Sequence, residues 1–204
     1  VVTRAFAEET ATLVEAKAVE RGVRFVRDFV EAGAEAGSTG NAETGADAGE
    51  ATGTAQAGSS GSSAASDLGT FEGDTGALSS ALVNLLENAV EACAADTRKQ
   101  DHAVTFRVRG TPDEVTFTII DNGTGMDRET REKLFTLFFS SKGSAGTGIG
   151  LFVASQVVRQ HGGHIAVVSE PGEGSTFTVS LPRRLPDAVR RGDAAGEEQR
   201  ASDA

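Results

Sequence analysis

The sequence has a single cysteine, a single methionine and no long apolar run. Cys93 cannot form a disulfide within the chain, which is typical of proteins from a reducing compartment. No stretch approaches the roughly 20 apolar residues of a membrane-spanning helix, and residues 1–10 lack the pattern of a signal peptide. We therefore expect a soluble, cytoplasmic protein. Because the sole methionine is Met126, residue 1 is not an initiator, and we expect a piece of a longer protein.

Basic residues are also scarce, with 19 Lys and Arg against 30 Asp and Glu, for a net charge of −11. This balance argues against nucleic-acid binding, which needs a basic surface. Residues 32–66 contain no apolar side chain larger than alanine, so they cannot offset their ordering entropy and are predicted to be a disordered insert. Residues 183–204 are predicted to be a disordered tail. The remainder suffices for one independent core.

Hydrophobic periodicity predicts helices over residues 3–20, 78–93 and 148–161, and strands over 23–30, 68–73, 103–110, 114–121, 164–170 and 175–181. Turn sequences at 111–113 and 171–174 join the later strands into hairpins. Asp127 is expected to cap a short helix over 128–135. Helices combined with antiparallel hairpins indicate an α+β fold, a two-layer α/β sandwich.

Two asparagines stand four residues apart on the predicted helix 78–93. Asn84 and Asn88 therefore project from neighbouring positions of one helix face. Carboxamide oxygens are hard ligands suited to Mg²⁺. Asparagines that bond only to the local backbone explain the pair equally well, so the helix alone leaves both interpretations open.

The stretch "IIDNGTGMD" runs from a predicted strand into a glycine-rich turn. Asp121, at the strand end, could accept a hydrogen bond from the amino group of adenine, and Gly123 and Gly125 allow a tight turn. Taken alone, the pattern favours an ordinary turn. The same holds for "EPGEGSTF", where Gly172 and Gly174 fit a simple hairpin.

Three alternate glycines, Gly146, Gly148 and Gly150, lead directly into the predicted helix 148–161. A helix N-terminus presents unpaired N–H groups to anions, and Lys142 just before it supplies a cation. Phe135, Phe138 and Phe139 either anchor this segment or pack in the core. The spacing matches neither the P-loop nor the dinucleotide-binding fingerprint.

Taken together, these motifs occur in an order that resembles the ATP-binding domain of sensor histidine kinases. That domain belongs to the superfamily shared with DNA gyrase, the chaperone Hsp90 and MutL. The resemblance runs from about Val23 to Pro182 and is interrupted by the insert. It implies a Bergerat-type sandwich, in which a mixed sheet carries helices on one face and ATP lies under a mobile lid. The lid resembles the short one of nitrogen-regulator kinases.

The resemblance also implies a role for each matching position. Asn88 matches the Mg²⁺ ligand, with Asn84 one turn earlier, and Asp121 matches the carboxylate that reads adenine. Lys142 matches the lid cation, and Thr176 matches a hydroxyl near the adenine site. The other positions expected to contact the nucleotide are Gly123, Gly125, Phe138, Phe139, Gly146, Thr147, Gly148, Ile149, Gly150 and Leu151.

Three features of the sequence depart from some relatives. Hydrolysing members and anti-sigma-type serine kinases usually carry a glutamate as general base at the position of Asn84, and an amide cannot accept a proton at neutral pH. A neutral histidine acceptor needs no strong base, so Asn84 favours a histidine kinase. Glu91 replaces a basic residue, which leaves Lys142, helped by Arg98 or Lys99, to balance the phosphates. Leu137 stands where many relatives have proline.

None of the three histidines fits a phosphoacceptor, which would lie on an exposed helix. His102 begins a predicted strand, and His161 and His164 surround a helix end. We therefore expect a catalytic domain, residues 21–182, without its dimerisation helices. The helix over 3–20 is either the linker to those helices or the domain's own first helix.

The expected activity is transfer of the ATP γ-phosphoryl group to a histidine outside this chain, with Asn84 and Lys142 as catalytic residues. The expected cofactors are ATP and Mg²⁺. The expected partners are histidine-bearing dimerisation helices and, indirectly, the receiver domain of a response regulator, without nucleic acid or membrane contact. The alternatives are a nucleotide-dependent protein-binding module, an anti-sigma-type kinase, or an ATP hydrolase of the gyrase or Hsp90 type.

Overall fold

The computed structural model describes residues 1–29, 68–139 and 148–187. The predicted insert 32–66 and most of the predicted tail lie outside the described residues. The elements are α1 (Thr3–Glu20), β1 (Arg24–Phe29), α2 (Thr75–Ala95), β2 (Ala103–Gly110), β3 (Glu114–Asp121), α3 (Arg128–Lys133), α4 (Gly150–Gln160), β4 (His164–Glu170) and β5 (Gly174–Pro182).

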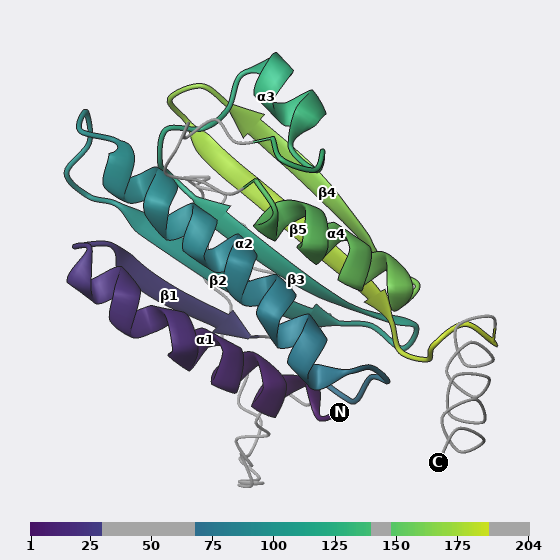
Figure 1. Ribbon diagram of the computed structural model, residues 1–204. Helices are drawn as coiled ribbons and strands as arrows, with labels where there is room; N and C mark the ends of the chain where they lie inside the picture. Colours follow the sequence, from purple (N-terminus) through teal and green to yellow (C-terminus); the bar gives the residue numbers. More distant parts are fainter. Residues whose placement is uncertain (30–67, 140–147, 188–204) are drawn as a thin grey trace, which may run out of the picture.

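The strands form one mixed sheet in the order β1-β2-β3-β5-β4. β1 pairs with β2 in parallel, and the other neighbours are antiparallel. Helices α1, α2 and α4 lie side by side on one face of this sheet (Figure 1). The predicted two-layer sandwich is confirmed.

One predicted strand is wrong. Residues 68–73 form no strand, and Thr70 makes only an isolated bridge with Val2. The apolar side chains that suggested a strand, Leu68 and Phe71, are buried by packing instead. Gly69 between them has a φ of +69°, which interrupts an extended backbone.

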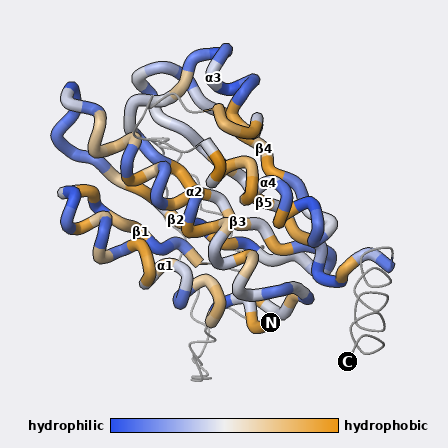
Figure 2. The backbone as a smooth tube through the Cα atoms, in the orientation of Figure 1, coloured by the Kyte–Doolittle hydropathy of each residue, from blue (hydrophilic) through white to orange (hydrophobic). Residues whose placement is uncertain are grey.

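The core lies between the sheet and the helices. Along β2 and β3 every second residue is buried, including Phe106, Phe117 and Ile119, because alternate side chains of a strand point to opposite faces. Hydrophobic positions recur along the helices and strands in the tube of Figure 2. Phe6 of α1 meets Phe117 edge to face at 5.8 Å. α1 therefore contributes to the same core as α2 and the sheet.

The first turn of α1 contacts the described chain on both sides of residues 30–67. The Thr3 N–H donates to the Gly69 carbonyl at 3.0 Å, and the Arg4 guanidinium donates to the Phe29 carbonyl at 3.0 Å. Phe29 is the last described residue before the gap, and Gly69 is the second described residue after it. The two ends of the gap are fixed to one rigid element.

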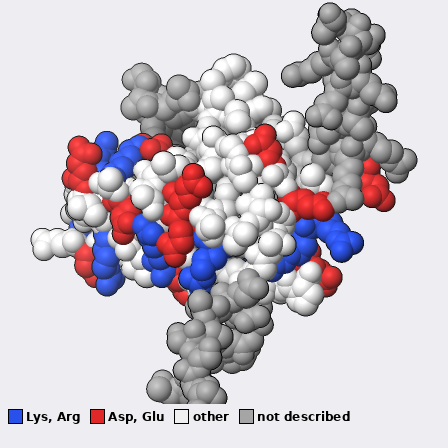
Figure 3. Space-filling model, turned by 90° about the horizontal axis from the view of Figure 1, so that it is seen from below, with Lys and Arg blue, Asp and Glu red and all other residues white. Residues whose placement is uncertain are grey.

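Charged side chains of both signs are interspersed on the face seen in Figure 3. Oppositely charged side chains also pair between elements, as Arg27 of β1 does with Glu8 and Glu15 of α1. The described residues on this face form no continuous basic surface of the kind that nucleic-acid binding requires.

Candidate functional site

The candidate site centres on Asp121, the last residue of β3. Asp121 continues the alternation of Phe117 and Ile119, so its side chain points into the helix layer and is only 4% exposed. Oδ1 accepts a hydrogen bond from the Gly123 N–H at 3.0 Å. Oδ2 is buried and has no hydrogen-bond partner among the described residues. Burial raises the pKa of Asp121 to about 6, although hydrogen bonding of the carboxyl to Gly123 and Ser175 acts to lower it. A buried acceptor of this kind calls for a donor from a ligand.

The loop after Asp121 is held by close backbone contacts. A Cβ at Gly123 would overlap the backbone of Ala92 in α2, and a Cβ at Gly125 would overlap the Glu170 carbonyl. The Thr124 N–H donates to the Ala92 carbonyl at 3.2 Å. Gly123 and Gly125 thus lie beside Asp121, as the sequence indicated, and both positions require the absence of a side chain.

The hydroxyl beside Asp121 belongs to Ser175, not to Thr176 as the sequence predicted. Ser175 pairs directly with Asp121 across β3 and β5, so both side chains point to the same face. Thr176 pairs with Ile120 and lies on the face without helices. A shift of one residue along a strand reverses the face. The buried Phe177, two residues after Ser175, could have given the correct parity from the sequence.

The two asparagines lie on the side of α2 that meets α4. The Asn88 amide nitrogen donates to the Asn84 carbonyl at 2.7 Å, so one interaction is local. Because the nitrogen makes this bond, the oxygen is the atom of Asn88 with ligand chemistry suited to Mg²⁺. A Cβ at Gly150 would lie 3.2 Å from Asn84 Oδ1. Asn84 therefore lies against the N-terminus of α4, a close approach that a glycine at position 150 permits.

The N-terminus of α4 is joined to the phenylalanine segment before it. The Phe138 N–H donates to the Gly148 carbonyl at 3.1 Å, and a Cβ at Gly148 would come within 2.7 Å of the Phe139 carbonyl. Gly148 has a φ of +64°, which favours glycine. Ile149, the N-cap, makes no side-chain cap, so it leaves the first N–H groups of α4 to other acceptors. Lys142, Gly146 and Thr147 lie outside the described residues.

Of the phenylalanines, Phe135 takes the core-packing role that the sequence left open, and Phe138 does not. Phe135 packs against the core, whereas Phe138 is 73% exposed and has a φ of +64°. A positive φ is rare for a bulky residue and is strained. Leu151, in the first turn of α4, is half-buried against the core. Phe138 and Leu151 thus lie on either side of the junction at Gly148.

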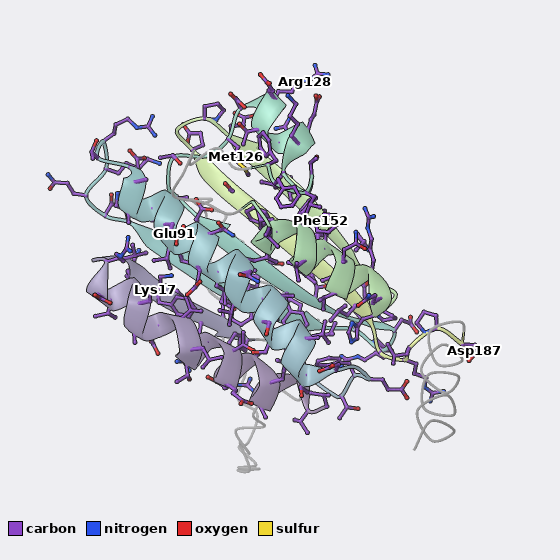
Figure 4. The ribbon with its side chains drawn as sticks, in the orientation of Figure 1. Lys17, Glu91, Met126, Arg128, Phe152 and Asp187 are labelled. Atoms are coloured by element: carbon purple, nitrogen blue, oxygen red, sulfur yellow. The ribbon has the colours of Figure 1, made fainter. Side chains whose placement is uncertain are left out.

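The charged residues near α2 are paired away from the N-terminus of α4. Lys17 of α1 binds Glu87 at 2.9 Å and Glu91 at 3.7 Å, so Glu91 faces α1 (Figure 4). Arg98 is paired with Asp96 at 2.8 Å. Lys99 donates to the Asn122 carbonyl at 2.9 Å.

These pairings correct one suggestion from the sequence. Asp96, which holds Arg98, follows Asn84 by twelve residues, about 18 Å along a helix axis. Arg98 therefore lies near the Asp121 end of the site and not near the N-terminus of α4. Lys99, bound beside Asp121, is at the same end. Neither is placed to balance phosphates at Gly150.

No histidine of the chain lies on an exposed helix face. His161 caps α4, where Nδ1 lies 2.7 Å from the Val157 carbonyl and Nε2 accepts from the Asp74 N–H at 3.0 Å. His102 Nε2 lies 2.7 Å from the Asp96 carbonyl, and His164 begins the edge strand β4. His161 therefore fastens the end of α4 to the start of α2, which is a structural role.

In the part of the chain that the structure describes, no group of three His, Cys, Asp or Glu side chains could hold a metal ion. Among the same residues, no helix is both long and apolar enough to cross a membrane.

Solved structures show the same fold. The chain superimposes on the catalytic domain of histidine kinase ThkA, in a nucleotide-free form, with a TM-score of 0.63 and 20% identity, covering 91% of this chain and 95% of that domain. The mycobacterial sensor histidine kinase MprB matches with a TM-score of 0.60 and 20% identity, covering 91% of this chain and 97% of that one. Full-length ShkA in complex with AMPPNP gives a TM-score of 0.61 at 20% identity, with 93% and 32% coverage.

Curated relatives are named as histidine kinases. The sensor-like histidine kinase SenX3 of Mycolicibacterium smegmatis is 37% identical over 133 residues, which cover 63% of this chain and 33% of SenX3. The sensor histidine kinase ZraS of Klebsiella oxytoca is 39% identical over 112 residues, with 54% and 23% coverage. The chain thus spans a third or less of the length of these relatives.

The family model described as histidine kinase-, DNA gyrase B- and HSP90-like ATPase matches residues 73–185. This match includes every described element of the candidate site, from α2 through β5. The chain belongs to this family of ATPase domains.

Proposed function

We propose that this chain binds ATP with Mg²⁺ and is the catalytic domain of a sensor histidine kinase, transferring the γ-phosphoryl group to a histidine outside the chain. The observation that carries the proposal is the buried Asp121 Oδ2, which has no partner among the described residues. It stands at the end of β3, inside the helix layer, in a family of ATPase domains. An exocyclic amino group of adenine would supply the donor that this oxygen requires.

The other end of the site suits phosphates. The N-terminus of α4, a helix of eleven residues, presents N–H groups without a side-chain cap, and such termini favour anions. Asn84 lies against it through Gly150, and Asn88 is one turn further along α2. We propose the same contacts as the sequence did for Gly148, Ile149, Gly150 and Leu151, and assign Lys142 as the cation.

The metal assignment follows from ligand chemistry. The carboxamide oxygens of Asn88 and Asn84 would hold Mg²⁺, and because an amide oxygen is a single neutral ligand, phosphate oxygens and water would complete the coordination. Bound Mg²⁺ would neutralise charge on the transferring phosphoryl group. The chain itself would hold the base at Asp121 and align the phosphates at α4.

Asn84 also bears on the type of reaction. Asn84 lies against the N-terminus of α4, and its amide cannot take a proton from water or from a serine hydroxyl at neutral pH. This favours a histidine acceptor over the hydrolase and the anti-sigma-type kinase. Since none of the three histidines lies on an exposed helix face, the acceptor would come from dimerisation helices of the parent protein.

The domain boundaries are part of the proposal. We assign residues 21–182 to the catalytic domain, and the packing of Phe6 against Phe117 supports adding α1 to it as its own first helix. The names of SenX3 and ZraS support a response regulator as the downstream acceptor. We also propose a cytoplasmic location, which fits the single, buried Cys93.

The proposal is tested in two steps. Calorimetric titration of the chain with ATP, with and without Mg²⁺, should show micromolar-to-millimolar binding that tightens with the metal. The chain is then mixed with the separately produced dimerisation helices of SenX3 and γ-labelled ATP, and acid-labile label should appear on those helices. The helices with their acceptor histidine replaced serve as the control.

Each step has an outcome that contradicts the proposal. Absence of ATP binding would remove the nucleotide site. Binding accompanied by metal-dependent release of inorganic phosphate, at the same rate with and without the helices, would favour the hydrolase.

A further inference from the structure

His161 joins the two helices that form the phosphate end of the site, where the N-terminus of α4 lies against α2. It is the C-cap of α4 and is buried. Its Nε2 accepts the Asp74 N–H at 3.0 Å, and its Nδ1 lies 2.7 Å from the Val157 carbonyl. A backbone N–H only donates and a carbonyl only accepts. Nδ1 therefore carries the hydrogen, and the Nε2 lone pair receives the bond from Asp74.

The imidazole occupies a space that a glycine keeps open. A Cβ at Gly73 would lie 2.9 Å from His161 Cδ2 and 2.8 Å from Leu78 Cδ1. Contacts this short would force the ring or the leucine side chain to move. A glycine at position 73 thus allows the ring to reach the Asp74 N–H.

α4 meets α2 at two points whose spacing matches on the two helices. At one point Gly150 lies against Asn84, and at the other His161 bonds Asp74, the N-cap of α2. Asn84 follows Asp74 by ten residues and His161 follows Gly150 by eleven, so the spans are about 15 and 16 Å of helix. The helices therefore run antiparallel and side by side (Figure 1), and the His161 bond sets the position of α4 along α2.

Apolar packing alone would fix this position less well. The buried apolar side chains of α4, Ala154 and Val158, are small, and hydrophobic contact has no preferred direction. A hydrogen bond is directional and weakens steeply when its angle changes. A slip of α4 along α2 would carry the first N–H groups of α4 away from Asn84.

The base end of the site, around Asp121, is built by other elements. Gly123 lies against the backbone of Ala92 in α2, and Gly125 lies against the Glu170 carbonyl of β4. A displacement of α4 should therefore change the contacts to the phosphates and leave those to the base.

We propose that His161 is a positioning residue for the phosphates of ATP: by accepting the Asp74 N–H, it holds the N-terminus of α4 against Asn84. The phosphates then meet the N–H groups of α4 and the metal ligands of α2 together. This inference rests on the proposed ATP binding and deepens it. His161 acts through α4 and not by contact with the nucleotide.

Two amide variants separate the two bonds of the ring. In His161→Gln the side-chain oxygen reaches the position of Nε2 and can still accept the Asp74 N–H. In His161→Asn the shorter amide can donate to the Val157 carbonyl but does not reach Asp74. Ser155→Ala is the matched control, because Ser155 is buried in α4 and bonds the Phe152 carbonyl of the same helix.

The experiment compares ATP with adenosine, which carries the base without phosphates. NMR titrations with Mg²⁺ present give the ratio of the two dissociation constants for the wild-type chain and each variant. His161→Asn should weaken ATP relative to adenosine about 2- to 12-fold, the range of one ordinary hydrogen bond. His161→Gln and Ser155→Ala should keep the wild-type ratio. A merely structural role of His161 would weaken both ligands by the same factor.

A second measurement uses the wild-type chain alone. If the His161 bond favours phosphate binding, phosphate binding must strengthen that bond by the same factor. Hydrogen exchange of the Asp74 amide should therefore slow when ATP and Mg²⁺ bind and should not slow when adenosine binds. It is measured relative to the Ala77 amide, which donates to Asp74 Oδ1 in the same helix turn and corrects for general stabilisation by the ligand.

The failures are distinguishable. If the wild-type chain binds neither ligand, the proposed function is wrong. If it binds both, but His161→Asn keeps the wild-type ratio or His161→Gln shifts it equally, the inference about His161 is wrong. Should His161→Asn fail to fold in a thermal melt, or adenosine bind too weakly to measure, the exchange decides. Asp74 exchange that ATP leaves unchanged relative to Ala77 then overturns the proposal.

Discussion

Replacement of Asp121 by asparagine separates the binding role of this side chain from its effect on stability. In Asp121→Asn, the amide oxygen can still accept the Gly123 N–H, which bonds Oδ1 at 3.0 Å. The amide nitrogen then replaces Oδ2, so the partnerless acceptor becomes a donor. A hydrogen bond to a charged group contributes about 1.5–3 kcal/mol, so ATP affinity should fall about 10- to 150-fold.

The same substitution should change stability in a pH-dependent way. Burial raises the pKa of Asp121 from 3.8 to about 6, so the folded state favours the protonated carboxyl. As pH rises from below 4 to above 6, ionisation of this buried group therefore removes stability. A shift of about 2 units corresponds to about 3 kcal/mol. The carboxamide of the Asp121→Asn variant does not titrate, so its free energy of unfolding should rise relative to wild type by about that amount.

The assay is urea unfolding of both proteins at a series of pH values, combined with titration of ATP at pH 8. With a pKa near 6, about half of the relative change falls between pH 5 and 8, which avoids the sequence pI near 4.7. A difference in unfolding free energy that does not vary with pH would show that Asp121 is not buried as an uncompensated carboxylate. Unchanged ATP affinity would remove Asp121 from the base site.

Two further predictions concern the backbone. Replacing residues 32–66 by a glycine–serine linker of about a quarter of their length should leave ATP affinity within about twofold, because α1 holds the chain on both sides of this segment. The free energy of unfolding should rise by about 1 kcal/mol, because closing a shorter loop costs less entropy. Titration and urea unfolding test this, and lost binding would contradict it. Gly125→Ala should destabilise the fold by more than about 2 kcal/mol in urea unfolding, because its Cβ meets the Glu170 carbonyl at a positive φ, whereas Gly22→Ala, also at positive φ but with open space, should cost about 1 kcal/mol. Equal effects of the two would show that the close packing at Gly125 is unimportant.

The sequence predicted the layers of the fold because its periodicities are strong. Every second residue of β2 and β3 is buried and the residues between are half-buried or exposed, and the predicted helix 78–93 lies within α2. The predicted bounds of this helix differ from the observed ones by two or three residues, because the cap is Asp74, whose side chain accepts the Ala77 N–H. The strand predicted over 68–73 is wrong because Gly69 has a positive φ and lies between Leu68 and Phe71, whose side chains are buried without forming a strand.

Contacts between distant segments could not be predicted in this way. Lys17 of α1 pairs with Glu91 of α2, 74 positions later in the sequence, so Glu91 faces α1 and not the phosphate side of the site. The choice of Ser175 over Thr176 depends on strand register, which sets the face of each side chain.

The two ends of the candidate site are built differently, and this has consequences for variants. At the base end, the backbones of Gly123, Gly125 and Gly174 approach other backbones too closely for a Cβ, so three separate segments are fixed together. At the phosphate end, the described residues on the two sides of 140–147 are joined by a backbone hydrogen bond between Phe138 and Gly148, and Phe138 itself is exposed and strained. Substitutions of the base-end glycines should therefore reduce stability and affinity together. Phe138→Gly should relieve the strain of the positive φ and change affinity while leaving the core packing intact, because the Phe138 side chain is exposed.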